Sequence, residues 1–546
     1  MRKIGRLERE LPNHRTMIMT NPGSLALRAA AAAVVALAIL SSPDLAHARA
    51  TPHGISAAVP QSRAAKKKVV KKPAHKRVAA GPPKTAWTSP RSLDALKGDI
   101  GGMVGTRVRG GKFGVMIVSL TRGDTLFAQN AGEMMNPAST MKLFSTAVAL
   151  DRFGPEHTFS TDVLRDGSVG PDGTLTGNLY LRADGDPSMS ARFFKDANLP
   201  MNTLAASVAA AGVKKVNGDL VFDATAFDDQ KIPEGWKTKN LGSAYSAKVS
   251  ALSLNENLVW VVVAPSSTGA LVTLEPATST IPLRSTVRQV NGGHGRIAAR
   301  RAADGGIDVS GTIGSSSRPL KYSLVVDDPA SFTAGALRSA LATAGITVSG
   351  QIRPARTPAT AVKVASFASP PLSQIVSEMN RESINIVAEL LFRDAARAGA
   401  PNGMSSADVA LANLRDFLGK KVGADPQGVH VFDGSGLSTL DYLTPRSMVQ
   451  LLSYAHRGPW SSAFHGSLPV AGESELLRRR MRGTPAEGNL HAKTGTTDTT
   501  VGLGGFVTAK DGEIVAFSFI YNGADRWNAK ATMDAMGATL ANFVRD

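Results

Sequence analysis

The run Asn136–Phe144 constrains this chain more than any other stretch, because it combines a helix start with two reactive side chains. An asparagine that can cap a helix and a proline suited to its first turn open the run, and apolar residues then recur at helical spacing up to Gly154. Ser139 therefore falls in the first turn, where backbone N–H groups have no partner inside the helix. Lys142 follows three positions later on the same face. A serine beside free amides and a lysine is a candidate nucleophile with its base.

A second motif, Ser383-x-Asn385, lies between two runs with amphipathic helical spacing. On a turn between helices, both side chains can point into one cleft. Ser253 and Asn255 form a rival pair with the same spacing, but they lead into a predicted strand at 258–264. The interhelical setting favours Ser383 and Asn385.

A third motif, within His491–Thr497, precedes the closing hairpin and is predicted to be a strand itself. Lys493 can offer positive charge to a substrate carboxylate. Thr494 and Thr496 can offer hydroxyl groups to the same substrate. Gly495 removes a side chain where a substrate backbone comes close.

The composition excludes some chemistries and narrows the partners. The 546 residues include no cysteine, which excludes disulfides and thiolate metal ligands, and the ten histidines show no zinc-binding spacing. We therefore predict no metal and no other cofactor. The net charge is +18, and most of it comes from the first 90 residues, which contain 16 Lys and Arg and 3 Asp and Glu. Residues 91–546 contain 46 Lys and Arg and 41 Asp and Glu. The folded part is only mildly basic, so a nucleic-acid partner is not indicated.

The first 90 residues are predicted to precede the folded part. Basic residues come before an apolar run from Ala29 to Leu40, and small residues near Ala48 fit a cleavage site, so residues 1–50 are typical of a secretory signal peptide. Residues 51–90 form a low-complexity linker. Its basic cluster, Lys66–Arg77, is either a solvated spacer or a tether to an anionic wall or membrane surface. We expect an exported protein of the periplasm or cell envelope.

The remaining sequence changes texture twice, which predicts three parts. Residues 91–158 contain a short helix, a hairpin and the Ser139 helix. Residues 159–354 contain short strands separated by Gly, Asp and Pro turns, which indicates a β-rich insertion of one or two small domains. Residues 355–546 return to helical periodicity and close with a hairpin and a last helix. The fold class predicted is α/β (α+β).

In chain order the motifs are Ser-x-x-Lys, Ser-x-Asn and Lys-Thr-Gly, a set shared by penicillin-binding proteins and class A β-lactamases. Over about residues 91–546 the chain resembles penicillin-binding D-alanyl-D-alanine carboxypeptidases/endopeptidases of the low-molecular-weight class C type (penicillin-binding protein 4-like serine peptidases). Further matching segments are Gly177–Arg182, Asp184–Pro187, Val249–Asn257, Asp433–Ser438 and Ser467–Gly472. The resemblance implies a transpeptidase-like domain, an antiparallel sheet flanked by helices, with its insertion between the first two motifs. It also implies that Ser435 belongs to a turn and is not a second nucleophile.

The resemblance implies acyl transfer on peptidoglycan stem peptides, and acylation by β-lactams. Ser139 would attack the carbonyl of the penultimate D-alanine, and Lys142, neutral through burial and the charge of Lys493, would accept its proton. Ser383 would relay a proton to the leaving amine. The backbone N–H groups of Ser139 and Thr496 would form the oxyanion hole.

The resemblance also assigns substrate-binding residues. Asn385 would hold the substrate amide, and Lys493, Thr494 and Thr496 would hold the terminal carboxylate beside Gly495. One segment differs: similar enzymes often place an aspartate shortly after Gly-Trp, where it helps to hold the free end of the peptide side chain. Here Gly235-Trp236 is followed by Lys237-Thr238-Lys239-Asn240, which leaves the recognition of that end open.

Two alternative functions use the same residues. A β-lactamase or esterase would need a group that activates water for rapid deacylation, and none is identified between Ser383 and Lys493; the insertion also suits a polymer substrate better. A wall-binding protein with an inactive site is the other alternative, but every catalytic side chain is present.

Overall fold

The computed structural model describes residues 86–397 and 404–546. The predicted signal segment 1–50, the basic cluster Lys66–Arg77 and most of the predicted linker lie outside the described residues. Within the described ranges, no helix combines the length and the apolar character that a membrane span requires.

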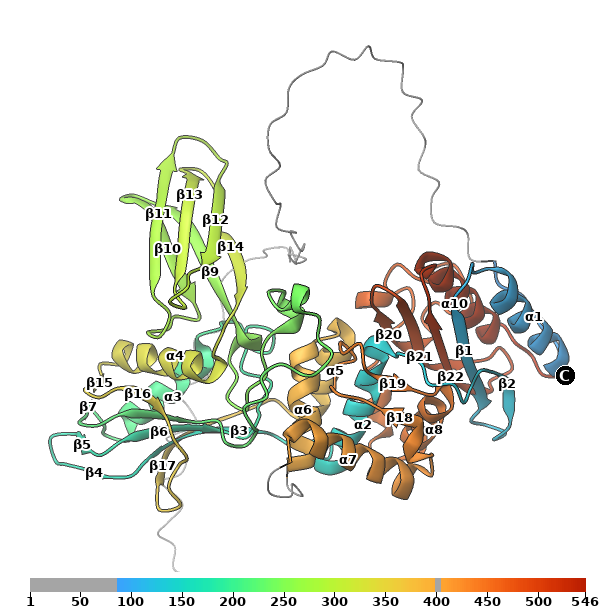
Figure 1. Cartoon of the computed structure of the whole chain (residues 1–546), viewed down its shortest axis with the longest axis horizontal. Coiled ribbons are helices and arrows are strands. Elements are labelled where there is room, and N and C mark those ends of the chain that lie inside the picture. Colours follow the sequence, from blue (N-terminus) through green and yellow to red (C-terminus); the bar gives the residue numbers. More distant parts are fainter. Residues whose placement is uncertain (1–85, 398–403) are drawn as a thin grey trace, which may run out of the picture. The chain divides into compact units, whose positions relative to one another are not determined.

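A five-stranded antiparallel sheet brings the two ends of the described chain together (Figure 1). Its strand order is β2-β1-β22-β21-β20, and its strands are β1 (Lys112–Ser119), β2 (Thr125–Gln129), β20 (His491–Thr496), β21 (Thr500–Thr508) and β22 (Ile514–Asn522). Strands β1, β21 and β22 are buried along nearly their whole length, because helices cover both faces of the sheet. Strand β20, which carries the third motif, is at the edge.

Two helical layers sandwich this sheet (Figure 1). One layer consists of α1 (Leu93–Thr106) and α10 (Arg526–Ala541). The other layer consists of α2 (Lys142–Phe153), α5 (Leu372–Glu382), α6 (Asn385–Arg397), α7 (Ser406–Phe417), α8 (Pro445–Arg457) and α9 (Ser461–Gly466), with the two-residue strands β18 (Val429–His430) and β19 (Tyr442–Leu443). Helix α2 is buried on all sides from Lys142 to Leu150, because other helices of its layer surround it. The fold therefore buries the lysine of the first motif completely.

Between α2 and α5 the chain forms a β-rich region with its own hydrophobic core. Its sheets have the orders β16-β8-β6-β3-β17, β15-β7-β5-β4, β10-β9-β14 and β11-β13-β12. The strands are β3 (Ser160–Arg165), β4 (Ser168–Val169), β5 (Thr174–Thr176), β6 (Leu179–Ala183), β7 (Lys215–Val216), β8 (Leu220–Asp223), β9 (Leu258–Ser266), β10 (Gly269–Glu275), β11 (Leu283–Val290), β12 (Arg296–Arg301), β13 (Ile307–Gly314), β14 (Leu320–Val325), β15 (Thr347–Val348), β16 (Ile352–Pro354) and β17 (Val362–Ala368), and the helices are α3 (Leu199–Ala210) and α4 (Pro329–Thr343). Because β17 pairs with β3, the sheet of the insertion extends past residue 354 to Ala368.

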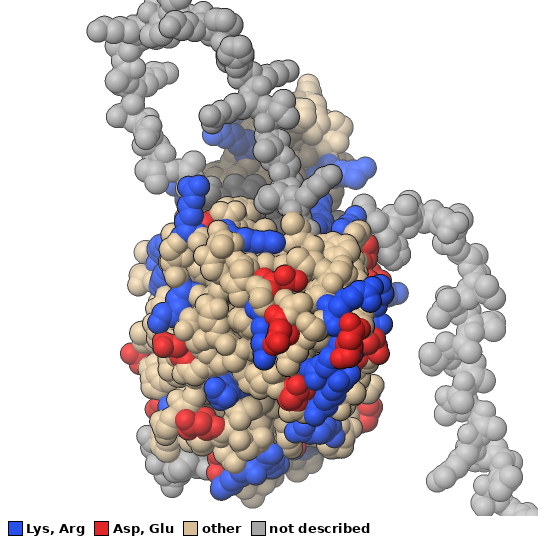
Figure 2. Space-filling view, turned by 90° about the vertical axis from the view of Figure 1, so that its right-hand side faces the viewer, with Lys and Arg blue, Asp and Glu red and all other residues tan. Residues whose placement is uncertain are grey.

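The surface charge of the folded part is mixed. On the face drawn in Figure 2, Lys and Arg side chains lie among Asp and Glu side chains. This distribution agrees with the small excess of basic residues in the sequence after residue 90.

Candidate active site

Ser139 lies in a 3₁₀ turn, Ala138–Met141, that leads into α2. Ala138 has a φ of 47°, a left-handed conformation that alanine rarely adopts, and its N–H donates to Asn136 Oδ1 at 3.1 Å. Such strain persists where the surrounding structure holds the backbone, and it is concentrated at functional sites. The serine therefore precedes the α-helix in a tighter turn than the sequence predicted, and it is half-buried.

Strand β20 passes directly against this turn, which explains Gly495. A Cβ atom at Gly495 would lie 2.8 Å from Pro137 O and 3.0 Å from Ser139 N. The sequence predicted a close approach by substrate at this glycine, whereas here the chain's own backbone makes the approach.

The backbone N–H of Thr496 points away from the sheet. Thr497 N donates to Thr500 O at 3.0 Å, and in an antiparallel ladder hydrogen-bonded and non-hydrogen-bonded pairs alternate. The pair Thr496–Val501 is therefore a non-hydrogen-bonded one. The Thr496 N–H thus faces the free edge of β20, and the Ser139 turn packs on the sheet face at the preceding residue, Gly495.

Lys142 connects the first two motifs. Its side chain is 0% exposed, and Nζ donates to Ser139 Oγ at 3.1 Å, to Asn385 Oδ1 at 2.6 Å and to Ser435 O at 2.7 Å. Three acceptors surround an amine that offers three directions for hydrogen bonding. The position of the nitrogen next to the Ser139 hydroxyl is therefore fixed.

Burial lowers the pKa of Lys142 from 10.5 to about 7, against the opposing effect of Asp433, Glu389 and Asp441, which raise it. The charge of Lys493 is not among the causes, contrary to the expectation from the sequence. Burial lowers the pKa of Lys493 itself well below 10.5, and the charge of Lys142 lowers it further.

In the turn between α5 and α6, the two residues of the second motif each hydrogen-bond to a different lysine. Ser383 ends α5 in a left-handed conformation, with a φ of 58°, and its Oγ accepts from Lys493 Nζ at 2.9 Å. Asn385 starts α6, accepts from Lys142 and donates from Nδ2 to Tyr245 O at 2.7 Å. All three motifs thus meet in one site.

The remaining residues of the third motif line the same strand. Lys493 Nζ also donates to Thr494 O at 2.9 Å. Thr494 is nearly buried and Thr496 is exposed, and within the described ranges neither hydroxyl has a hydrogen-bond partner. Both hydroxyls are free to bind a ligand.

The rival pair Ser253 and Asn255 has a local structural role in the insertion. Ser253 Oγ donates to Ser250 O at 2.8 Å, and Asn255 Nδ2 donates to Leu258 O at 3.0 Å. In the described part of the chain, neither side chain hydrogen-bonds to a residue of the other motifs.

A buried carboxylate, Asp433, was not predicted as a site residue but shapes the site. It accepts four backbone N–H groups from Ser435–Ser438, at 2.5 to 3.1 Å, and the indole Nε1 of Trp236 at 2.7 Å. The loop held in this way turns Ser435 O toward Lys142, and Gly436, with a φ of 77°, leaves room for Ala138 O. Ser435 therefore belongs to a turn, as the resemblance implied.

The insertion contributes the segment Glu234–Ser246, which we call the wall segment. At one end Trp236 donates to Asp433, and at the other end Tyr245 O accepts from Asn385. The sequence marked Trp236 only by its Gly-Trp context, and nothing in it marked the Tyr245 carbonyl, because a backbone acceptor has no sequence signature.

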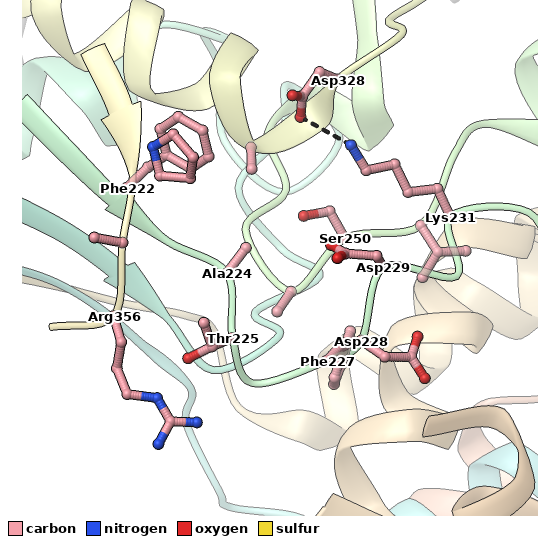
Figure 3. A pocket seen from close by; sticks show the side chains of 15 residues that line it. Phe222, Ala224, Thr225, Phe227, Asp228, Asp229, Lys231, Ser250, Asp328 and Arg356 are labelled. Carbon is pink, nitrogen blue, oxygen red and sulfur yellow. Dashed lines mark ion pairs between the residues drawn. The ribbon is translucent and has the colours of Figure 1, made fainter. Parts of the chain in front are cut away.

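The insertion also contains a cavity that is separate from this site. A cavity of about 540 Å³ is located in the insertion and contains none of the predicted site residues; Lys231 and Asp328 form an ion pair of 3.4 Å at it (Figure 3). Within the described ranges, no group of three or more His, Cys, Asp or Glu side chains is arranged to hold a metal ion.

Comparison with known proteins agrees with this arrangement. The chain matches the D-Ala-D-Ala carboxypeptidase 3 (S13) peptidase family over residues 104–543. It is 33% identical over 480 residues to the D-alanyl-D-alanine carboxypeptidase of Actinomadura sp. (strain R39), covering 84% of this chain and 87% of that protein. It is 25% identical over 423 residues to the D-alanyl-D-alanine carboxypeptidase DacB of Haemophilus influenzae, covering 76% and 86%.

Solved structures share the fold. The crystal structure of penicillin binding protein 4 (dacB) from Haemophilus influenzae has a TM-score of 0.65 at 22% identity, covering 80% of this chain and 98% of that chain. A crystal structure of the same protein complexed with a β-lactam has a TM-score of 0.61 at 23% identity, covering 81% and 98%. The chain belongs to the S13 family of D-Ala-D-Ala carboxypeptidases. The predicted fold class and the predicted serine-type carboxypeptidase activity are confirmed.

Proposed function

We propose that the chain cleaves D-Ala-D-Ala-terminated peptidoglycan stem peptides, and D-alanyl cross-links between them, through an acyl-enzyme on Ser139. Ser139 Oγ forms an ester with the carbonyl of the penultimate D-alanine, the peptide C–N bond breaks, and the amine leaves with a proton. Water then hydrolyses the ester and restores the Ser139 hydroxyl.

The hydrogen bonds of Lys142 carry this proposal. Asn385 Oδ1 and Ser435 O can only accept hydrogen bonds, whereas the Ser139 hydroxyl can also donate. A neutral amine has two N–H groups and one lone pair. The two acceptors take the N–H groups, so the lone pair faces Ser139 Oγ. With a pKa lowered to about 7, Lys142 is neutral often enough near neutral pH to act as the base.

The other motif residues take the roles that their partners allow. Ser383, which accepts a hydrogen bond from Lys493, passes a proton to the leaving amine. Lys493, with the Thr494 and Thr496 hydroxyls, binds the terminal carboxylate, whose charge favours the protonated form of Lys493. Asn385 orients Lys142 and can donate its second Nδ2 hydrogen to the substrate amide.

The oxyanion hole is assigned to two backbone N–H groups, those of Ser139 and Thr496. Support comes from the direction of the Thr496 N–H, toward the free edge of β20, and from the contact between β20 and the Ser139 turn. One such donor commonly contributes about 3–4 kcal/mol to transition-state stabilisation.

A β-lactam would acylate Ser139 and remain attached, because its leaving amine stays tethered to the acyl group. Rapid turnover of β-lactams would require a carboxylate that activates water. Among the carboxyl groups of α6, Glu389 is the candidate for this role. It is buried, however, and its Oε1 accepts a hydrogen bond from Gly434 N at 2.7 Å. No observation therefore favours a β-lactamase.

Action on peptidoglycan requires export, and the signal-like segment 1–50 supports a location in the periplasm or cell envelope. The basic cluster Lys66–Arg77 would attach the enzyme to an anionic wall or membrane surface. For the folded part we propose that the insertion begins near residue 158 and ends after β17, at Ala368, which is later than the boundary predicted at residue 354.

Labelling with a fluorescent penicillin tests the proposed function. The purified enzyme should form one covalent band, and Ser139→Ala should form none, while wild type releases D-alanine from a stem pentapeptide. An undiminished band in Ser139→Ala would contradict the assignment of the nucleophile. Rapid multiple turnover of a chromogenic cephalosporin would instead favour the β-lactamase.

A further inference from the structure

The wall segment contacts a residue in or beside each of the three motifs. Its contacts with Asp433 and Asn385 were described above, and a third contact reaches the end of β20. There Lys237 Nζ and Lys239 Nζ both lie 3.4 Å from the same carboxylate oxygen, Asp498 Oδ2. Asp498 is two residues beyond Thr496. Lys237 and Lys239, in the segment that follows Gly235-Trp236, thus stand at the edge of the site.

This cluster has an excess of positive charge that is open to solvent. The side chains of Lys237, Lys239 and Asp498 are 39%, 68% and 63% exposed, and two ammonium groups share one carboxylate. A further basic group lies next to this turn: Arg526 donates to Thr497 O at 2.7 Å. Exposed ion pairs of this kind contribute little to stability, so a ligand can exchange with Asp498.

The direction of β20 indicates which part of a substrate reaches this cluster. In the proposed function the terminal carboxylate lies at Lys493 and Thr494, and the scissile carbonyl lies at the Thr496 N–H. A peptide added to the free edge of β20 advances by about 3.3–3.4 Å per residue. Because β20 ends at Thr496, the residues that precede the scissile carbonyl continue toward the turn that contains Asp498. The position beyond Thr496, next to Asp498, therefore faces the residue that precedes the two D-alanines.

We propose that Lys237 and Lys239 bind a second anionic group of the substrate, a carboxylate on the side chain of the residue that precedes D-Ala-D-Ala. The inference rests on the proposed function, since it uses the same substrate path. Asp498 competes with that carboxylate for both lysines. The rim of the site thus selects peptides by charge, apart from the chemistry at Ser139.

A matched set of three peptides tests this selectivity. The peptides end in D-Ala-D-Ala and differ only in the tip of the preceding side chain, which is a carboxylate, a carboxamide or an ammonium group. The readout is kcat/KM for D-alanine release, with active enzyme titrated by a fluorescent penicillin. Wild type should prefer the carboxylate over the carboxamide by about threefold to tenfold, mostly through KM, and should disfavour the ammonium peptide.

Three variants separate the groups. Lys237→Gln with Lys239→Gln should bring the ratio of carboxylate to carboxamide peptide close to one. Asp498→Asn should increase the ratio by a few fold, because it removes the competing carboxylate. The matched control, Lys214→Gln with Lys215→Gln, changes two exposed lysines of the insertion and should keep the wild-type ratio.

Two results would count against the inference. A wild-type ratio near one, or the same ratio in the Lys237→Gln, Lys239→Gln variant as in wild type, would overturn the anionic site while leaving the peptidase intact. Failure of wild type to release D-alanine from all three peptides would instead overturn the proposed function, on which the inference rests.

Discussion

Two pairs of lysines, one inside the site and one at its rim, show how surroundings decide what a lysine does. Lys142 and Lys493 are fully buried and held by hydrogen bonds of 2.6 to 3.1 Å to fixed partners. Lys237 and Lys239 are exposed and share one carboxylate at 3.4 Å. Burial makes a lysine a candidate base with a directed lone pair, whereas exposure leaves a cation that can change partners.

The two pairs also differ in the elements that carry them. Lys142 is the first residue of α2 and Lys493 lies in β20, so the central layers of the fold position both. The rim lysines belong to the wall segment, a loop of the insertion. The fold thus separates a rigid interior suited to chemistry from a rim whose side chains can vary.

The strongest test of this difference makes the same substitution in both regions. Lys142→Met replaces the lysine with a side chain of similar length that has no amine. We therefore expect acylation of Ser139 by a fluorescent penicillin to slow by about 10⁴-fold or more. Lys239→Met should change the rate by only a few fold. Acylation of Lys142→Met at more than a hundredth of the wild-type rate would show that the amine is not the base.

A methyl group added at matched glycines tests rigidity, with a smaller expected effect. Gly495→Ala places Cβ against Pro137 O and Ser139 N, and the displaced serine should lose about 10²-fold in acylation rate. Gly242→Ala in the wall segment meets no atom within 4 Å and should stay within about twofold of wild type. Equal rates in the two variants would mean that the Ser139 turn tolerates movement. The rim substitutions Lys237→Gln and Lys239→Gln come last, with the threefold to tenfold effects given above.

Local sequence patterns were sufficient to predict much of the fold and of the candidate site. Helical spacing and stop signals located α2, α5 and α6, and the hairpin pattern located β21 and β22. The three motifs could be placed because a helix start, an interhelical turn and an edge strand each have a local signature. The Ala-rich helix α3 and strands such as β11 and β12 were not predicted, because their apolar spacing is weak and their pairing depends on distant segments.

What could not be predicted depends on contacts across the chain. Ser435 O, Asp433 and Tyr245 O define the surroundings of Lys142 and Asn385, yet two of these groups are backbone carbonyls that any residue could supply. The insertion extends to Ala368 because β17 pairs with β3, about 200 residues earlier in the sequence. The source of the lowered Lys142 pKa also required knowledge of burial.

The pH dependence of Ser139 acylation tests the central claim, that burial makes Lys142 a neutral base. Its pKa is lowered to about 7, so the neutral form predominates above that pH and becomes tenfold rarer with each pH unit below it. The second-order rate constant for a fluorescent penicillin should therefore fall about tenfold per unit below about pH 7 and level off above it. A rate that is constant from about pH 5 to 7, or that keeps rising tenfold per unit up to about pH 10 as for an ordinary lysine, would contradict the account.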